Sequence, residues 1–287
     1  LLVMVCFFGI YYSRIDGMGF LKFTNLFFYI YLFLSIIDFF QNYSGGIYKS
    51  FAFGINGYAL RGLGGTSANI DVFAALFLLV NYFYGKKLFK FFHVVVGLGV
   101  IFLTSTLSPI LVLLVVVLVN IALFLRFTKR AIFLLYIVLI SIIIFYSAIE
   151  FADNEYVLSI TNGRSIIWGQ QLIAFFSNLT FWSAIFGNTE AMIVNIPWGE
   201  GLTNNPHNSY LFVLFRFGIF FTLLSILFFY LKVNKMSGVD FILFMALIAA
   251  GFPGITPLYI TNPYYILLGV FLILKNEQVM ALHRRKL

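Results

Sequence analysis

A histidine beside a proline is the strongest candidate for acid–base chemistry in this chain. His207 stands where a long polar stretch meets an apolar run, in the sequence Asn204-Asn205-Pro206-His207-Asn208-Ser209-Tyr210-Leu211. Proline suits the first turn of a helix, so His207 is expected at a helix N-terminus and at the lipid–water boundary. The helix dipole disfavours a protonated imidazole there, which keeps His207 neutral and able to accept a proton. The alternative is a histidine that only anchors the interface or bonds a loop carbonyl.

An arginine and a tryptophan form the second candidate, in the sequence Asn162-Gly163-Arg164-Ser165-Ile166-Ile167-Trp168. A spacing of four places Arg164 and Trp168 on one face of a helical turn. Arginine binds phosphate through a planar fork and keeps its charge when partly desolvated. The pair therefore suits a phosphate-bearing substrate. The alternative is an arginine that stacks on Trp168 or pairs with Asp153 or Glu155.

A glycine-rich stretch next to Arg61 is the third candidate. Residues 60–71 read Leu-Arg-Gly-Leu-Gly-Gly-Thr-Ser-Ala-Asn-Ile-Asp and precede an apolar run. Glycines let backbone N–H groups converge on an anion, and Thr66 or Ser67 would cap the helix that follows. A helix N-terminus beside Arg61 suits a phosphate-binding site. The spacing matches neither a Walker A loop nor a dinucleotide fingerprint. Glycine-rich turns that merely cap membrane helices are the alternative.

Arg216 is the fourth candidate, nine residues after His207 and inside an apolar run. An arginine at that depth is costly and normally faces a polar cavity or an acidic partner. Asp38 and Glu150, near the outer ends of other apolar runs, are candidate partners. We expect Arg216 to act on substrate.

Other chemistries lack their residues in this sequence. The histidines, carboxylates and single Cys6 show no metal-ligand spacing, and no G-x-S-x-G nucleophile turn is present. No metal site and no cofactor are therefore expected. Glu190 and Glu200 could form a carboxylate pair, but their separation in a loop cannot be judged from sequence.

The elements that must hold these residues are membrane helices. Hydrophobic residues make up 62% of the 287 and charged residues 10%, far from the composition of a soluble domain. Apolar runs of this length predict an all-α polytopic membrane protein, one membrane domain over 1–287. The predicted spans number about nine, the first truncated and the last two short or kinked: 1–12, 20–40, 69–85, 88–104, 109–126, 131–149, 208–231, 239–253 and 258–275. Because the chain opens with Leu1 inside an apolar run, further helices are expected before it.

The net charge of +8 reflects topology rather than nucleic-acid binding. Cytoplasmic loops are enriched in Lys and Arg. Alternating the spans around a cytoplasmic Lys86 places 14 of the 18 basic residues inside and leaves four outside: Lys49, Arg61, Arg164 and Arg216. Three of those four belong to the candidates above, so the chemistry is expected on the outer side.

The segment 150–207 between spans 6 and 7 is the extended polar stretch of the chain. A loop of this length is usually functional or disordered, and its many aromatic residues, including Trp168 and Trp182, make disorder a poor interpretation. We expect a folded cap lying on the outer membrane face.

Taken in order, these loops resemble the O-antigen polymerase (Wzy-type) and O-antigen ligase superfamily of bacterial membrane glycosyltransferases. The resemblance runs from about residue 55 to the end. It rests on the Arg61 glycine loop with Asn69, the Ser105-Thr106-Leu107-Ser108-Pro109 break, Gly163-Arg164 with Trp168, and above all on Pro206-His207-Asn208-Ser209-Tyr210-Leu211. One departure is Pro109, where the family usually carries an arginine after the serine.

The resemblance implies an enzyme that takes a glycan from an undecaprenyl-diphosphate carrier at the periplasmic face of the bacterial inner membrane. His207 would remove the proton from the attacking sugar hydroxyl, with inversion and without a metal ion or cofactor. Arg61, Arg164 and Arg216 would hold the diphosphate, and Asn208 and Trp168 would help to bind the glycan. The implied partners are the lipid-linked glycan and membrane lipid, with no nucleic acid. A chain-length regulator protein is a further candidate partner.

Three functions stay open from the sequence. A polymerase would join two lipid-linked repeat units into O-antigen or a related surface polysaccharide, and the Phe-, Ile- and Tyr-rich composition favours it. A ligase would transfer the glycan to lipid A–core. A flippase or transporter would bind a polyprenyl-linked sugar without chemistry, but it should concentrate ionisable residues near the bilayer midplane.

Overall fold

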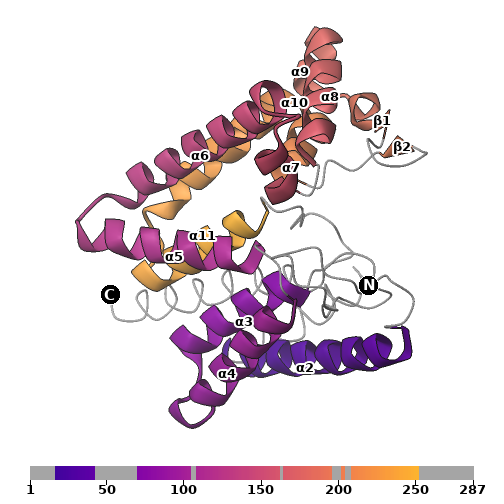
Figure 1. Ribbon diagram of the computed structural model, residues 1–287. Coiled ribbons are helices and arrows are strands. Elements are labelled where there is room, and N and C mark those ends of the chain that lie inside the picture. Colours follow the sequence, from indigo (N-terminus) through magenta and orange to yellow (C-terminus); the bar gives the residue numbers. More distant parts are fainter. Residues whose placement is uncertain are drawn as a thin grey trace. The chain divides into compact units, whose positions relative to one another are not determined.

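The protein is described here by a computed structural model that covers residues 17–42, 70–104, 108–161, 164–195, 202–203 and 208–251. These residues are almost all helical (Figure 1). The chain divides into two compact units. Unit 1 contains residues 1–117, 242–250 and 257–287, and unit 2 contains residues 118–241 and 251–256. The described parts of both units are apolar helices, and the single membrane domain over 1–287 stays a prediction.

Unit 1 is built around a buried helix. It contains α2 (Gly17–Asn42), α3 (Ile70–Tyr84), α4 (Lys87–Thr104) and parts of α5 (Ser108–Phe124) and α11 (Gly238–Ala250). Every residue of α3 from Ile70 to Asn81 is buried. Phe28 of α2 stacks on Phe77 of α3, with ring centroids 4.1 Å apart. Gly97 lets α4 approach α3 closely, because a Cβ there would lie 2.9 Å from the Leu78 Cβ.

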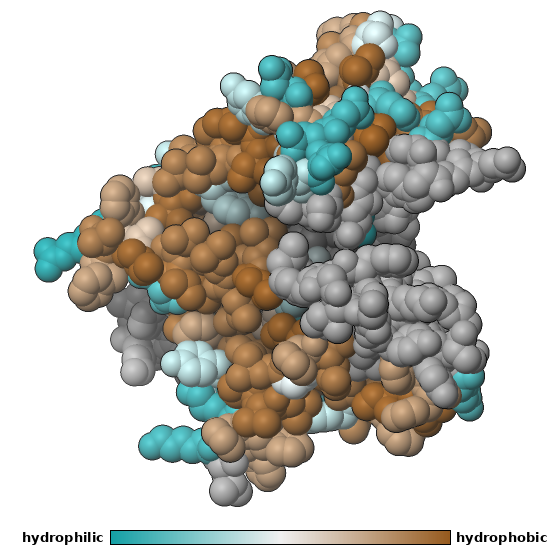
Figure 2. Space-filling view, in the orientation of Figure 1, coloured by the Kyte–Doolittle hydropathy of each residue, from teal (hydrophilic) through white to brown (hydrophobic). Residues whose placement is uncertain are grey.

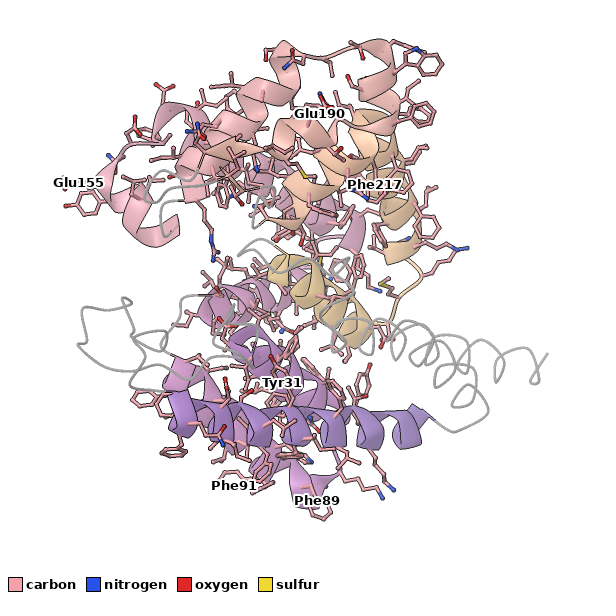
Figure 3. The ribbon with its side chains drawn as sticks, turned by 90° about the vertical axis from the view of Figure 1, so that its right-hand side faces the viewer. Tyr31, Phe89, Phe91, Glu155, Glu190 and Phe217 are labelled. Carbon is pink, nitrogen blue, oxygen red and sulfur yellow. The ribbon has the colours of Figure 1, made fainter. Side chains whose placement is uncertain are left out.

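Polar side chains join these apolar helices. Asn25 of α2 and Asn81 of α3 exchange two hydrogen bonds through their amide groups, 2.8 and 2.9 Å long. The hydroxyl of Tyr29 is hydrogen-bonded to Nδ1 of His93 on α4. In an apolar surrounding such bonds hold helices together, because an unpaired polar group there is costly. The other side of α4 is exposed: Figure 3 shows Phe89 and Phe91 at its edge.

Unit 2 has two long helices, α6 (Lys129–Phe145) and α10 (Ser209–Val233). Thr128 caps α6 by accepting a hydrogen bond from the Ala131 N–H. At the start of α6, Lys129 Nζ donates to the Met236 carbonyl and Arg130 Nε donates to the Tyr230 carbonyl. The basic clusters 126–130 and 232–235, which the charge pattern assigns to one side of the membrane, therefore lie at the same end of the α6/α10 pair.

The predicted cap is folded, and much of it is helical. The π-helical turn η4 (Tyr146–Glu150) continues α6 and is followed by α7 (Glu155–Thr161), α8 (Arg164–Ser177), α9 (Phe181–Phe186) and the 3-10 turn η5 (Thr189–Met192). Strands β1 (Val194–Asn195) and β2 (Leu202–Thr203) pair antiparallel. The helix α8 was not expected from periodicity, because its apolar residues are interrupted by glycine, glutamine and serine. Figure 3 shows Glu155 at the outer edge of α7.

Within the described residues, three helical stretches are long and apolar enough to cross a membrane: Thr24–Gln41, Lys129–Glu150 and Ser209–Val233. Shorter apolar helices are Ile70–Tyr84, Phe89–Thr104, Ser108–Phe124 and Gly238–Ala250. Helices are confirmed at each of the seven predicted spans that fall within the described residues, whereas 1–12 and 258–275 lie outside them. Figure 2 shows hydrophobic residues over much of the face that it draws. The exposed apolar side chains of α6 include Leu135, Val138 and Ile142. A membrane protein accounts for this surface.

Candidate active site

The start of α10 is held from several directions. The buried side chain of Asn208 caps the helix, accepting hydrogen bonds from the N–H groups of Tyr210 (3.0 Å) and Leu211 (3.2 Å). Ser209 N–H donates to the Gly251 carbonyl over 2.9 Å. The hydroxyls of Tyr210 and Tyr136 lie 3.0 Å apart in a hydrogen bond that joins α10 to α6. Each described residue of the His-Asn-Ser-Tyr-Leu motif thus fixes the first turn of this helix.

The start of α8 is held equally closely. Ser165 Oγ donates to the Ala152 carbonyl over 3.0 Å, and Trp168 is 2% exposed. At Gly169 the helix lies against η4 so tightly that a Cβ would be 2.3 Å from the Ala148 carbonyl oxygen. Arg164, the first residue of α8, is half-buried. The helix N-terminus beside this guanidinium group is a favourable place for an anion.

One hydrophobic core joins these two helix starts. Trp168, Leu172 and Phe175 of α8 pack in the same buried cluster as Leu211 and Phe215 of α10. The remaining buried members come from α6, η4 and η5: Ile140, Ile144, Ala148, Ala191 and Met192. Trp168 lies four residues after Arg164, and Leu211 lies four residues after His207 in the sequence. The residues that anchor the two predicted site segments are therefore neighbours in one core.

A break within α10 was not predicted. Gly218 has φ 82° and ψ 172°, a conformation essentially restricted to glycine, and it divides the helix into residues 209–217 and 219–233. Gly187, which ends α9, has nearly the same angles, φ 84° and ψ 174°. The two glycines meet: a Cβ on Gly218 would lie 2.8 Å from the Gly187 nitrogen. The Asn188 N–H donates to the Phe215 carbonyl over 2.7 Å, which satisfies a group that the break removes from the helix.

The contacts with α6 show that this break bends α10 strongly. Arg130 reaches the Tyr230 carbonyl and Tyr136 reaches the Tyr210 hydroxyl. Six residues of α6 span about 9 Å, whereas the twenty residues from Tyr210 to Tyr230 would span about 30 Å in a straight helix. The two lengths disagree by too much for side chains to bridge, so residues 209–217 must turn away from the axis of residues 219–233.

Arg216 lies two residues before this break, and its side chain is exposed. The expectation of a polar cavity or an acidic partner around Arg216 has no counterpart among the described residues. The backbone of Arg216 instead packs closely against Gly187. A Cβ on Gly187 would lie 2.5 Å from the Arg216 carbonyl carbon. Figure 3 shows the neighbouring Phe217 on α10. The bend therefore places a cation at an exposed corner of the helix.

The structure describes some of the predicted site residues and not others. His207 and Arg61 lie outside the described residues, as does the glycine loop before Ile70, so their roles stay predictions. Arg164 stands at the start of α8, and Arg216 is exposed beside the break. Asn208 and Trp168 are 0% and 2% exposed, which favours a role in holding the starts of α10 and α8. Of the possible carboxylate pair, Glu190 is exposed in η5 (Figure 3) and Glu200 is not described.

A buried glutamine in this core was missed from the sequence. Gln171 is fully buried, and its Nε2 donates to the Met192 carbonyl over 2.7 Å. Its Oε1 has no hydrogen-bond partner within the described part of the chain. The one sequence signal for this buried polar group was a glutamine on an otherwise apolar face of α8. Gly218, a single glycine inside an apolar run, was the corresponding signal for the break.

Comparison of the chain with protein-family models, with curated proteins and with solved structures finds no match. Among the described residues, no group of three or more His, Cys, Asp or Glu side chains is placed to hold a metal ion.

Proposed function

We propose that this protein is a bacterial inner-membrane glycosyltransferase of the O-antigen polymerase type. It joins undecaprenyl-diphosphate-linked repeat units at the periplasmic face. The observation that carries the proposal is the shared core beneath two predicted site segments. Trp168 and Leu211, each four residues after a predicted site residue, pack in one cluster. Such an arrangement suits a reaction in which Arg164 and His207 act on one substrate.

The proposed reaction needs a base and cations, without a metal or cofactor. His207 removes the proton from the attacking sugar hydroxyl, whose oxygen forms the new bond to the anomeric carbon of the donor. The bond from that carbon to the diphosphate oxygen breaks, and the diphosphate leaves with the electron pair. Attack opposite the leaving group inverts the anomeric centre. Arg61, Arg164 and Arg216 neutralise the diphosphate, and the anchored helix starts supply the positioning.

The burial of Asn208 and Trp168 refines the proposed roles. The side-chain oxygen of Asn208 accepts hydrogen bonds from two backbone N–H groups of α10. We therefore assign Asn208 the role of positioning the residue that precedes it, and not of binding a sugar. Trp168 holds α8 in the core while Arg164, one turn earlier, remains half-buried at the helix start. Both act as positioning residues, and the substrate contacts fall to the three arginines and His207.

Substitutions test the proposed roles directly. His207→Ala and Arg164→Ala should each abolish glycan polymerisation while the protein is still made and inserted. The matched controls are His283→Ala and Arg126→Ala, because both residues belong to the predicted cytoplasmic side and Arg126 is exposed in the turn after α5. Glycan banding at the wild-type level from the His207 variant would exclude the mechanism.

Genetics separates polymerase from ligase. Loss of a polymerase leaves lipid A–core capped with a single repeat unit. Loss of a ligase leaves the core uncapped and accumulates lipid-linked polymer. We expect the first pattern from a deletion strain, with restoration of long chains by the wild-type gene.

A transporter of a polyprenyl-linked sugar is the second candidate, favoured by the polar contacts inside unit 1. Asn25, Asn81, Tyr29 and His93 place hydrogen-bonding groups among apolar helices. These groups bond to one another, which suits helix packing as well as a passage. Extension of a lipid-linked repeat unit by purified protein in detergent would exclude transport without chemistry.

A further inference from the structure

The end of α8 and the whole of α9 expose apolar side chains in a stretch without charge. No charged residue lies between Arg164 and Glu190. Within this stretch Ile173 is 63% exposed and Phe176 is 50% exposed, and the exposed fractions of Phe181, Trp182 and Phe186 are 71, 66 and 67%. These five residues are called the α9 patch below. The surface of a soluble protein is rich in charge, so the α9 patch is not built to face bulk water.

Hydrogen bonds pair several backbone groups at the two ends of α9. Thr180 and Ser183 form a capping box, in which each side chain accepts a hydrogen bond from the N–H of the other residue. At the other end Gly187 N–H donates to the Ser183 carbonyl, and Asn188 N–H donates to the Phe215 carbonyl. These bonds pair the N–H groups of Thr180, Ser183, Gly187 and Asn188, which lowers the cost of placing this short helix in lipid, where unpaired backbone groups are costly.

The docking of α9 on the α10 break sets its distance from the basic end of unit 2. Residues 219–233 span about 21 Å, and Lys232 and Lys129 mark their far end. A hydrocarbon core is about 30 Å thick. With Lys232 at one boundary and residues 219–233 along the bilayer normal, α9 would lie within about 10 Å of the opposite boundary. Amphipathic helices sit at that depth, about 5–10 Å into the boundary between headgroups and acyl chains, and aromatic side chains collect there.

We propose that the α9 patch is seated in the boundary between lipid headgroups and acyl chains, on the side opposite the basic end of unit 2. The occupant of this surface is the bilayer itself. Because the stretch carries no charge, zwitterionic lipid is sufficient and anionic lipid adds little. The patch holds the bend of α10 at a fixed depth, and with it the exposed Arg216. This inference rests on α10 crossing the membrane and not on glycan chemistry, so it can fail or stand independently of the proposed transferase.

Depth-dependent quenching of Trp182 fluorescence tests the proposal. Wild-type protein and Trp182→Phe are reconstituted into phosphatidylcholine vesicles with bromine at acyl positions 6,7 or at 11,12, and the difference between their emissions isolates Trp182. Trp168 and Trp198 are present in both proteins, so their emission cancels in the difference. We expect the shallow bromines to quench the difference signal more than the deep bromines, and aqueous iodide to quench it least.

Each other pattern overturns the proposal. Quenching by iodide alone places Trp182 in water, and strongest quenching by the deep bromines places it in the centre of the bilayer. Protection from every quencher means that a second copy or another protein covers the patch. If the difference emission is weak, a nitroxide on Trp182→Cys in a Cys6→Ser background gives the same decision. Greater accessibility to oxygen than to a water-soluble nickel chelate is then expected.

Discussion

Replacing Gly218 by alanine is expected to destabilise the protein because two glycines meet at the α10 break. At φ 82° and ψ 172°, a residue other than glycine is strained by about 1–3 kcal/mol. The new Cβ would also lie 2.5 Å from the Ala184 carbonyl oxygen, so the backbone must move. That movement breaks the hydrogen bond from Asn188 N–H to the Phe215 carbonyl, and leaving such groups unpaired costs about 1–3 kcal/mol. The expected loss is the sum of the two costs, about 2–6 kcal/mol.

The assay is thermal stability in detergent, read as the fraction of protein that stays monodisperse after heating. A chain of this size shifts its Tm by about 2–4 °C per kcal/mol, so Gly218→Ala should lower the Tm by about 4 °C or more. Gly99→Ala is the matched control. A Cβ at Gly99 of α4 would meet no atom of the described chain within 4 Å, and alanine favours a helix interior by about 1 kcal/mol.

A second variant tests whether the two glycines act together. Gly187→Ala should lower the Tm to a similar extent, because its Cβ would lie 2.5 Å from the Phe215 carbonyl oxygen. The double variant should lose less than the two single losses combined, since one displacement relieves both clashes. A Gly218→Ala protein as stable as Gly99→Ala would exclude the glycine contact as the cause of the break, because α10 would then accept a helical residue there.

The remaining predictions concern single polar side chains and use the same thermal assay. Asn208→Ala removes the α10 cap and should cost about 1 kcal/mol, whereas Asn208→Ser should keep most of the stability. Gln171→Glu should destabilise the protein far more than Gln171→Met, because the core would have to accept a charge. Asn25→Leu should cost about 0.6–2 kcal/mol because Asn81 Oδ1 loses its donor, while Asn81 Nδ2 keeps its bond to the Phe77 carbonyl. Adding Asn81→Leu should recover part of that loss.

Three results would contradict these predictions. Equal stability of the alanine and serine variants at Asn208 would show that the cap does not hold the start of α10. A Gln171→Glu protein as stable as Gln171→Met would place that side chain outside the core. A double leucine variant that loses the full amount of both single changes would show that the two asparagines act independently.

The long apolar helices could be predicted because their cause is local. A run of apolar residues that must satisfy its own backbone becomes a helix whatever its neighbours are. The seven predicted spans within the described residues are helices for this reason. Thr128 before α6 and Asn208 before α10 mark helix starts through side-chain oxygens that accept backbone N–H groups.

The bend of α10 could not be predicted, because its cause is a contact between segments distant in sequence. Gly218 becomes a break only where Gly187 rests against it, thirty-one positions earlier. The roles of Trp168 and Asn208 were also hidden, since residue type alone does not tell a buried anchor from a substrate contact. Their burial favours the role of an anchor. Arg216 was correctly placed on a helix, but its exposure depends on the unpredicted bend.

The most direct test of the proposed function is chain extension by purified protein. Wild-type enzyme and the His207→Ala, Arg164→Ala and His283→Ala variants are incubated with an undecaprenyl-diphosphate-linked repeat unit in detergent and a metal chelator. The products are separated by length. We expect polymer from the wild type and from His283→Ala, and unextended repeat units from His207→Ala and Arg164→Ala. Polymer of normal length from the His207→Ala protein would contradict the proposed role of His207.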